Sequence, residues 1–376
     1  MSVAGIIFSN LHDKEVFELT RVRTMASIPF ACRYRLIDFT LSNMVNSGIT
    51  DINVIVHYNY HSLMDHIGSG KDWDLARRSG GIKILPPYIT AYANNINSLY
   101  HTRLEALISV NYSISNINSD YILLSDCNII CNIDLKEVLN EHIQSNADVT
   151  IVTKNEDITN NKQRLSVFQA NENNDITDIA VNPTVMTGRH EVGLNIMVVN
   201  TKYLLSSIKN AISHNYTSFN YDILARNMGR DRFKIYKYNG YYAHISSFSD
   251  YFTASMDIIN NQNSRDALLN VKNRPIYTKI RNSAPTKYTN TSVIKNSIIA
   301  DGCTIEGSVE NTILFRGVKI GKNTFVKNSI LFQDTYVSEN VHLNCVVTDK
   351  NSIIRDGRIL SGHETLPYYI DKGKMI

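Results

Sequence analysis

The last third of the chain repeats a short motif, and this repeat constrains the possible fold more than any other feature. Asparagine, then Ser, Thr or Cys, then two aliphatic residues recur at spacings of 15, 17 and 16 residues, beginning at Asn296, Asn311, Asn328 and Asn344. Between these motifs, apolar residues recur every six positions, as at Val293, Ile299 and Ile305. Such a period is typical of a parallel β-helix built from hexapeptide repeats. Each coil of this fold buries its aliphatic side chains only by stacking on the next coil.

The first two thirds of the chain alternate strand-like and helix-like segments. We expect strands at 3–8, 51–56, 121–125 and 148–153, and helices at 35–46, 99–110 and 135–143. Strands separated by helices predict a parallel sheet with helices on both faces, a fold of the α/β class. Ligands of such sheets bind at the carboxyl ends of the strands.

Length and composition limit the domain organisation and the partners. A chain of 376 residues is long enough for two domains. We expect an α/β domain at 1–256, a connecting segment at 257–287 and the β-helix at 288–376. A net charge of +3 argues against a nucleic-acid partner, and the lack of a long apolar run argues against a membrane partner. The amino terminus does not resemble a signal peptide and the five cysteines are scattered, so we expect free thiols and a cytoplasmic location.

The loop after the first strand is unusual for a nucleotide-binding domain. Glycines normally occupy this loop because they let backbone N–H groups approach phosphate oxygens. Here the loop reads Asn10, Leu11, His12, Asp13, Lys14 and Glu15, with no glycine and two acids. The residues alone leave open whether the loop serves a different chemistry or none.

One long segment resembles a known enzyme family. Residues 35–49, RLIDFTLSNMVNSGI, closely resemble a segment of bacterial glucose-1-phosphate adenylyltransferases, also called ADP-glucose pyrophosphorylases. Residues 58–67 and 84–86 also look like that family, and the resemblance covers essentially the whole chain. It implies a Rossmann-like nucleotidyltransferase domain (GT-A-like) followed by a left-handed parallel β-helix. The family joins glucose 1-phosphate to ATP, and its chemistry needs positive charge for the phosphates and acidic ligands for Mg²⁺.

The resemblance lets each site position be compared with the family. The family's three loop glycines fall on Asn10, Leu11 and Asp13, and its triphosphate-binding arginine falls on Glu15, a reversal of charge. Other positions that have lost the family residue are Met25 for a phosphate-facing lysine, Val181 and Asn182 for the Glu-Lys pair of the sugar phosphate, and His244 for the second metal aspartate. Asp126 matches the first metal aspartate. Tyr88 and Asn97 fall on positions of the nucleotide pocket.

These losses predict a subunit that does not catalyse the reaction. The pattern resembles the non-catalytic, GlgD-type branch of the family, whose members raise the activity of a catalytic partner in a mixed tetramer. The resemblance therefore implies a catalytic partner subunit, no required cofactor, and Mg²⁺ only if some activity remains. Whether the chain also forms a homo-oligomer stays open. Candidates for a sugar-phosphate effector site between the domains are Arg33, Arg35, Lys322, Arg355 and Arg358.

Two other functions are compatible with parts of the sequence. Asp126 keeps open an active but divergent sugar-phosphate nucleotidyltransferase. A hexapeptide-repeat acyltransferase would need a catalytic histidine at a junction between coils, and His342 is the histidine inside the repeats. For each effector candidate, an ordinary solvated surface residue is the simpler interpretation.

Overall fold

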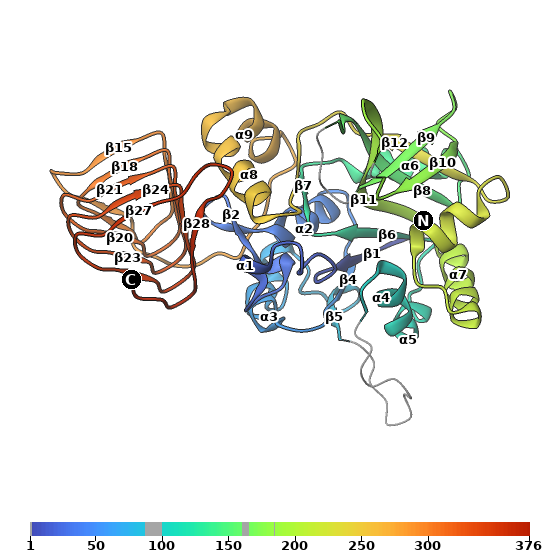
Figure 1. Ribbon diagram of the computed structural model, residues 1–376. Helices are drawn as coiled ribbons and strands as arrows, with labels where there is room; N and C mark the ends of the chain where they lie inside the picture. The colour runs from blue at the N-terminus through green and yellow to red at the C-terminus, as the bar shows by residue number, and fades with distance from the viewer. Residues whose placement is uncertain (1, 87–99, 160–164, 184) are drawn as a thin grey trace.

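The computed structural model describes residues 2–86, 100–159, 165–183 and 185–376. It places an α/β domain beside a stack of short coils formed by the last third of the chain (Figure 1). In the described part of the chain, no helix is both long and apolar enough to cross a membrane.

A mixed sheet forms the centre of the α/β domain. β1 (Val3–Phe8) lies between β4 (Asp51–Ile55) and β6 (Tyr121–Asp126), parallel to both, and β5 (Gly81–Leu85) extends this parallel half. β11 (Arg189–Asn200) then runs antiparallel to β6, to β8 (Val149–Asp157) and to β9 (Ser166–Ala170). β10 (Ile176–Val181) and β12 (Phe233–Lys237) complete the sheet. The expected all-parallel sheet is therefore wrong beyond β6, because β11 reverses the chain direction.

Helices cover both faces of this sheet, as expected. α2 (Leu36–Asn46), α3 (His61–Ile67) and α6 (Leu135–Gln144) pack on one face in a core that includes Ile7. α4 (Arg103–Ser109), α5 (Asn111–Ser115) and α7 (Thr201–His214) pack on the other face with Ile6. Neighbouring residues of a strand point to opposite faces, so β1 contributes to both cores.

The last third of the chain forms a parallel β-helix with three sheets. The first sheet holds β14 (Lys287–Tyr288), β17 (Thr304–Ile305), β20 (Lys319–Ile320), β23 (Tyr336–Val337) and β26 (Ile353–Ile354). The second holds β15 (Val293–Lys295), β18 (Ser308–Glu310), β21 (Phe325–Lys327), β24 (His342–Asn344) and β27 (Ile359–Ser361). The third holds β16 (Ile298–Ile299), β19 (Ile313–Leu314), β22 (Ile330–Leu331), β25 (Val346–Thr348) and β28 (Tyr368–Ile370).

The repeated asparagines mark one corner of this β-helix. Asn296, Asn311 and Asn328 have φ angles of 42°, 55° and 45°, in the left-handed region that asparagine tolerates better than most residues. Their side chains form a ladder, in which Nδ2 of Asn311 donates to Oδ1 of Asn328 at 3.0 Å, and Nδ2 of Asn328 donates to Oδ1 of Asn344 at 3.3 Å. The corner conformation and the ladder together explain why this residue type recurs.

The two halves share a hydrophobic core. α8 (Phe248–Asn260) and α9 (Gln262–Leu269) lie between the sheet domain and the coils (Figure 1). Their buried side chains form one cluster with Phe30 and Phe39 of the α/β domain and with Phe315 and Phe332 of the β-helix. The short β2 (Pro29–Phe30) and β3 (Tyr34–Arg35) form a hairpin on this side of the domain.

A buried ion pair crosses the same boundary. Nη2 of Arg23 lies 2.6 and 2.8 Å from the two carboxylate oxygens of Asp349, and both side chains are almost fully buried. The hydroxyl of Tyr369 also donates to this carboxylate, at 2.9 Å. Arg23 therefore joins the two halves.

Candidate functional site

Two features that the sequence singles out, the loop at 9–16 and Asp126, lie at the carboxyl ends of β1 and β6. The loop at 9–16 follows β1 and leads to α1 (Phe17–Thr20), and Asp126 is the last residue of β6. β1 and β6 are adjacent and parallel, with Phe8 paired to Asp126, so the loop and the carboxylate meet at one edge of the sheet.

The loop holds its own conformation through buried polar side chains. Nδ2 of Asn10 donates to Oδ2 of Asp13 at 2.6 Å, and the backbone N–H of Met25 donates to Oδ1 of Asp13, also at 2.6 Å. Burial raises the pKa of Asp13 to about 7, although these hydrogen bonds oppose the shift. None of residues 10–15 has a positive φ angle, so this loop conformation needs no glycine.

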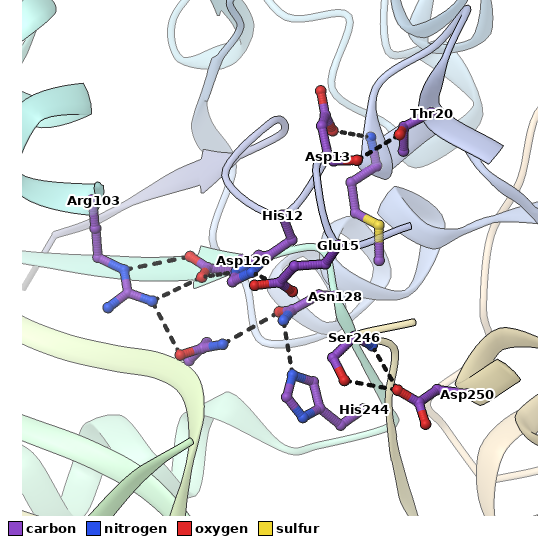
Figure 2. Close-up of polar contacts among 12 residues, drawn as sticks. His12, Asp13, Glu15, Thr20, Arg103, Asp126, Asn128, His244, Ser246 and Asp250 are labelled. Atoms are coloured by element: carbon purple, nitrogen blue, oxygen red, sulfur yellow. Dashed lines mark hydrogen bonds and ion pairs between the residues drawn. The ribbon is translucent and has the colours of Figure 1, made fainter. Parts of the chain in front are cut away.

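Asp126 is engaged by two cationic side chains (Figure 2). Nη2 of Arg103 lies 2.8 Å from Oδ2 of Asp126, and Nε2 of His12 lies 2.8 Å from the same oxygen. Burial opposes ionisation of Asp126, but the charge of Arg103 and the hydrogen bond from His12 outweigh it, so the pKa of this carboxyl falls below its ordinary value. The carboxylate is therefore ionised and neutralised from within the chain.

Glu15 completes this row of charges. Its Oε2 lies 3.1 Å from Nδ1 of His12. Burial lowers the pKa of His12, but hydrogen bonds and charges from Asp126 and Glu15 overcome that effect and raise it to about 9. His12 is then a cation at neutral pH, held between two carboxylates. Glu15 thus attracts His12, where the resemblance expects an arginine that attracts phosphate.

A second row of hydrogen bonds connects Arg103 to His244, which ends β13 (Tyr242–His244) beside β7 (Ile129–Cys131). Nη2 of Arg103 donates to Asn195 at 3.2 Å, Nδ2 of Asn195 donates to Asn128 at 3.3 Å, and Nδ2 of Asn128 donates to Nε2 of His244 at 3.0 Å. Burial, followed by the charge of His12, lowers the pKa of His244 to about 4. His244 is neutral and serves as an acceptor.

A cavity of about 240 Å³ is lined by His12, Glu15, Arg103, Asp126, Asn195 and His244. Val181 and Asn182 lie at its wall, as do Leu11 and the chain segment at 218–220. The four charged groups named above, His12, Arg103, Asp126 and Glu15, sum to zero net charge. A phosphate would therefore find no unpaired cation among them.

Comparison with known proteins identifies the family. A family described as Nucleotidyl transferase matches residues 6–261, and one described as GlmU-like, C-terminal hexapeptide, matches residues 283–364. The chain is 32% identical to the glycogen biosynthesis protein GlgD of Bacillus subtilis (strain 168), over 98% of this chain and 95% of that protein. It is 30% identical to a glucose-1-phosphate adenylyltransferase of Mycoplasma mobile, over 82% of this chain and 80% of that protein.

The chain belongs to the glucose-1-phosphate adenylyltransferase family. A similar protein of that name in Halalkalibacterium halodurans is 31% identical over 86% of this chain and 84% of its own length. The resemblance inferred from residues 35–49 is thereby confirmed, as is a nucleotidyltransferase domain followed by a left-handed β-helix.

The Mg²⁺ site implied by the adenylyltransferase family does not fit the residues present. Mg²⁺ requires oxygen ligands in octahedral geometry and binds carboxylates. Asp126 is engaged by His12 and Arg103. His244, which the resemblance sets at the second metal position, accepts a hydrogen bond from Asn128. Among the residues that the structure describes, no group of three His, Cys, Asp or Glu side chains is arranged to hold a metal ion.

The other candidate residues lie away from this cavity or outside the described part of the chain. Met25 is buried in the core shared with the β-helix, so its side chain serves packing. Tyr88 and Asn97 lie outside the described residues. His342 lies on the exposed outer face of β24, against the ring of Phe325.

The five effector candidates separate into two groups. Arg33 and Arg35 line a second cavity, at the boundary between the two halves, together with Arg281, Arg316 and Lys350. Lys322, Arg355 and Arg358 are exposed on the β-helix and do not line that cavity.

Sequence reasoning misses several residues of these sites. The sequence marks His12 only as part of the loop, and it does not single out Arg103, Asn195, Arg281, Arg316 and Lys350. Arg103 could have been found from the sequence. It is a cation at the first residue of α4, and Asp126 is an acid at the last residue of β6. The others become visible only when distant segments are brought together.

Proposed function

We propose that this chain is a regulatory, largely non-catalytic subunit of ADP-glucose pyrophosphorylase in glycogen biosynthesis. In this proposal it assembles with a catalytic subunit in a mixed tetramer and raises the turnover of that partner. The observation that carries the proposal is the engagement of Asp126 by His12 and Arg103. A carboxylate bound in this way is not available to a metal ion, and the metal is what such phosphoryl chemistry requires.

The electrostatics of the loop support the same proposal. Glu15 stands where the family has a phosphate-binding cation, and it is only partly exposed, at 22% of its side chain. An anion in that position repels a triphosphate, and the repulsion is strong in a site that excludes water. The name of the Bacillus subtilis relative, glycogen biosynthesis protein GlgD, agrees with this placement.

The proposal is tested by reconstitution with a catalytic glucose-1-phosphate adenylyltransferase subunit from the same source. ADP-glucose formation is measured for each chain alone and for the two co-expressed, and the mass of the complex is measured by light scattering. We expect no turnover from this chain alone and a higher turnover from the mixed complex. Normal pyrophosphorylase rates from the lone chain, or failure to co-purify with no change in rate, would contradict the proposal. Glu15→Gln in the lone chain is the control. It shows whether the charge of Glu15 is by itself the reason why the lone chain is inactive.

We also propose that the cavity between the two halves takes the phosphoryl group of a sugar-phosphate effector. Arg33, Arg35, Arg281, Arg316 and Lys350 line it, and the described lining residues include no carboxylate. Guanidinium groups bind phosphate well because their planar donors match its oxygens. A hexose bisphosphate added to the mixed complex is expected to change its turnover, and Arg316→Gln to weaken that response. Arg358→Gln, which alters an exposed arginine of the β-helix, is the matched control.

A further inference from the structure

Lys350 has an unusual place in the cavity between the two halves. The cavity measures about 40 Å³, and it is formed by the β2–β3 hairpin, by His66 and Arg281 of the α/β side, and by Phe315, Arg316, Gln333 and Lys350 of the β-helix. Four arginines and one lysine therefore meet in a space about the size of one small anion.

The nearby carboxylates are each paired with an arginine, and two of these arginines, Arg281 and Arg316, line the cavity. Nε of Arg316 lies 3.1 Å from Asp301, and Nη2 of Arg281 lies 3.3 Å from Asp65. Asp349, the residue next to Lys350 in the chain, pairs with Arg23 through both oxygens. Lys350 thus lines the cavity together with four arginines, and its neighbour in the chain is an acid that another residue neutralises.

This environment favours the uncharged amine. Burial, followed by the charges of Arg35 and Arg23, lowers the pKa of Lys350 to about 7. Asp349 opposes this shift, and Lys372 adds a smaller repulsion. His66, which also lines the cavity, has its own pKa lowered, chiefly by burial. A lysine of this kind is a nucleophile near neutral pH, whereas an ordinary lysine is protonated.

We propose that Lys350 is a modification site, acylated by anionic acyl donors of the acyl-phosphate class, whose phosphate is bound by the surrounding arginines. The lone pair of Nζ attacks the carbonyl carbon, the N–C bond forms, and the C–O bond to phosphate breaks. The nitrogen loses one proton, which the departing phosphate takes up through water, so that it leaves the arginines as hydrogenphosphate. No oxidant or reductant is needed. The arginines act here as they do in other phosphate sites, by holding the leaving group in position.

Acylation would close the cavity. The acyl group occupies the small space, and the amide nitrogen that results can carry no positive charge. The cavity would then stop binding phosphates. This inference shares with the proposed effector site the binding of phosphate by these arginines. It does not depend on a catalytic partner subunit, and its test does not use enzyme activity.

The test treats the full-length chain with acetyl phosphate at pH 7 and follows each lysine by peptide mass spectrometry. Because an ordinary lysine has a pKa near 10.4 and is mostly protonated at pH 7, we expect Lys350 to react at least ~10-fold faster than exposed Lys322. Added orthophosphate should slow acetylation of Lys350 and leave Lys322 unchanged. The rate at Lys350 should level off above about pH 8, while that at Lys322 continues to rise.

Substitutions distinguish the binding of the donor's phosphate by the arginines from the intrinsic reactivity of the Lys350 amine. Arg316→Gln should slow acetylation of Lys350 several-fold, and Arg358→Gln should not. Acetic anhydride carries no phosphate, so its reaction at Lys350 should be insensitive to Arg316→Gln. Lys350→Met, which adds no charge to the cavity, serves as the folding control, with an unchanged thermal midpoint and no mass shift at this peptide. The proposal is overturned if Lys350 reacts no faster than Lys322, or if neither orthophosphate nor Arg316→Gln affects it.

Discussion

Nε2 of His12 lies 2.8 Å from Oδ2 of Asp126, although the two residues are 114 positions apart in the chain. The contact places a protonated imidazole from the loop on the carboxylate that the resemblance sets at the first metal position. It holds the loop at 9–16 against the end of β6, where Arg103 contacts the same oxygen of Asp126. The consequences of this contact can be measured directly.

Removal of the carboxylate should destabilise the chain rather than change a metal site. In Asp126→Asn, the buried cations of His12 and Arg103 lose their counter-ion, and we expect unfolding in urea to become easier by about 3–5 kcal/mol. Asp356→Asn changes an exposed residue of the β-helix and should have little effect. Equal stabilities for the two variants would show that Asp126 is not a structural counter-ion.

The stability of the folded chain should fall as the pH rises through the folded pKa of His12. That pKa is about 9 in the folded chain, against 6.5 for an ordinary histidine, so the extra stability is complete below about pH 6.5 and is lost as the pH passes 9. A shift of this size corresponds to roughly 3–4 kcal/mol.

The measurement for His12 is the free energy of unfolding in urea at pH 6.5 and pH 9.5. The comparison is made against His12→Gln, so that other titrating groups, Asp13 among them, cancel. A constant difference between the two proteins across this range would contradict the assigned charge. Proton NMR titration of the His12 ring gives the pKa independently.

The ion pair between the two halves should matter more than an exposed ion pair close to it. Arg23→Met leaves the Asp349 carboxylate buried without its cation, and we expect a loss of about 3–5 kcal/mol in urea unfolding. Arg21 and Asp371 form the exposed pair, with side chains 52% and 36% exposed, so Arg21→Met should cost less than about 1 kcal/mol. If the two variants lost similar free energies of unfolding, burial would not make the Arg23–Asp349 pair more important than the exposed pair.

The asparagine corner of the β-helix offers a third comparison. Asn328 has a φ of 45° and is hydrogen-bonded to both neighbouring asparagines of the ladder. Asn328→Gly removes the side-chain hydrogen bonds and keeps an easy left-handed backbone, whereas Asn328→Ala also strains the backbone. We expect the Ala variant to be less stable than the Gly variant by about 1 kcal/mol in urea unfolding. The reverse order would mean that the corner does not select asparagine for its backbone conformation.

The β-helix could be predicted from the sequence because its cause is local. Each corner needs a residue that tolerates the left-handed conformation, and each coil needs apolar residues at a fixed step, so the pattern is visible along the chain. The helix at 35–46 is similarly predictable, and the structure places α2 at Leu36–Asn46. The antiparallel course of β11 has no comparable local signal, because strand direction depends on how the chain returns to the sheet.

The site could be predicted only in part. The missing glycines and the acid at position 15 indicate a changed loop, since each is a property of one residue. The roles of His12 and Arg103 depend on contacts with Asp126, which the sequence does not contain as a pattern. Likewise Arg33 and Arg35 are candidates from the sequence, but Arg316 and Lys350 join them only because the β-helix packs against the hairpin.

The core that includes Phe30, Phe39, Phe315 and Phe332 has a practical consequence for protein engineering. A truncated chain that ends between the sheet domain and the coils would leave one side of this core, and the Arg23–Asp349 pair, open to water. The two halves are therefore not interchangeable modules. A hybrid made with the coils of a catalytic relative would fold well only if that relative supplies a matching aromatic surface and an acid opposite Arg23.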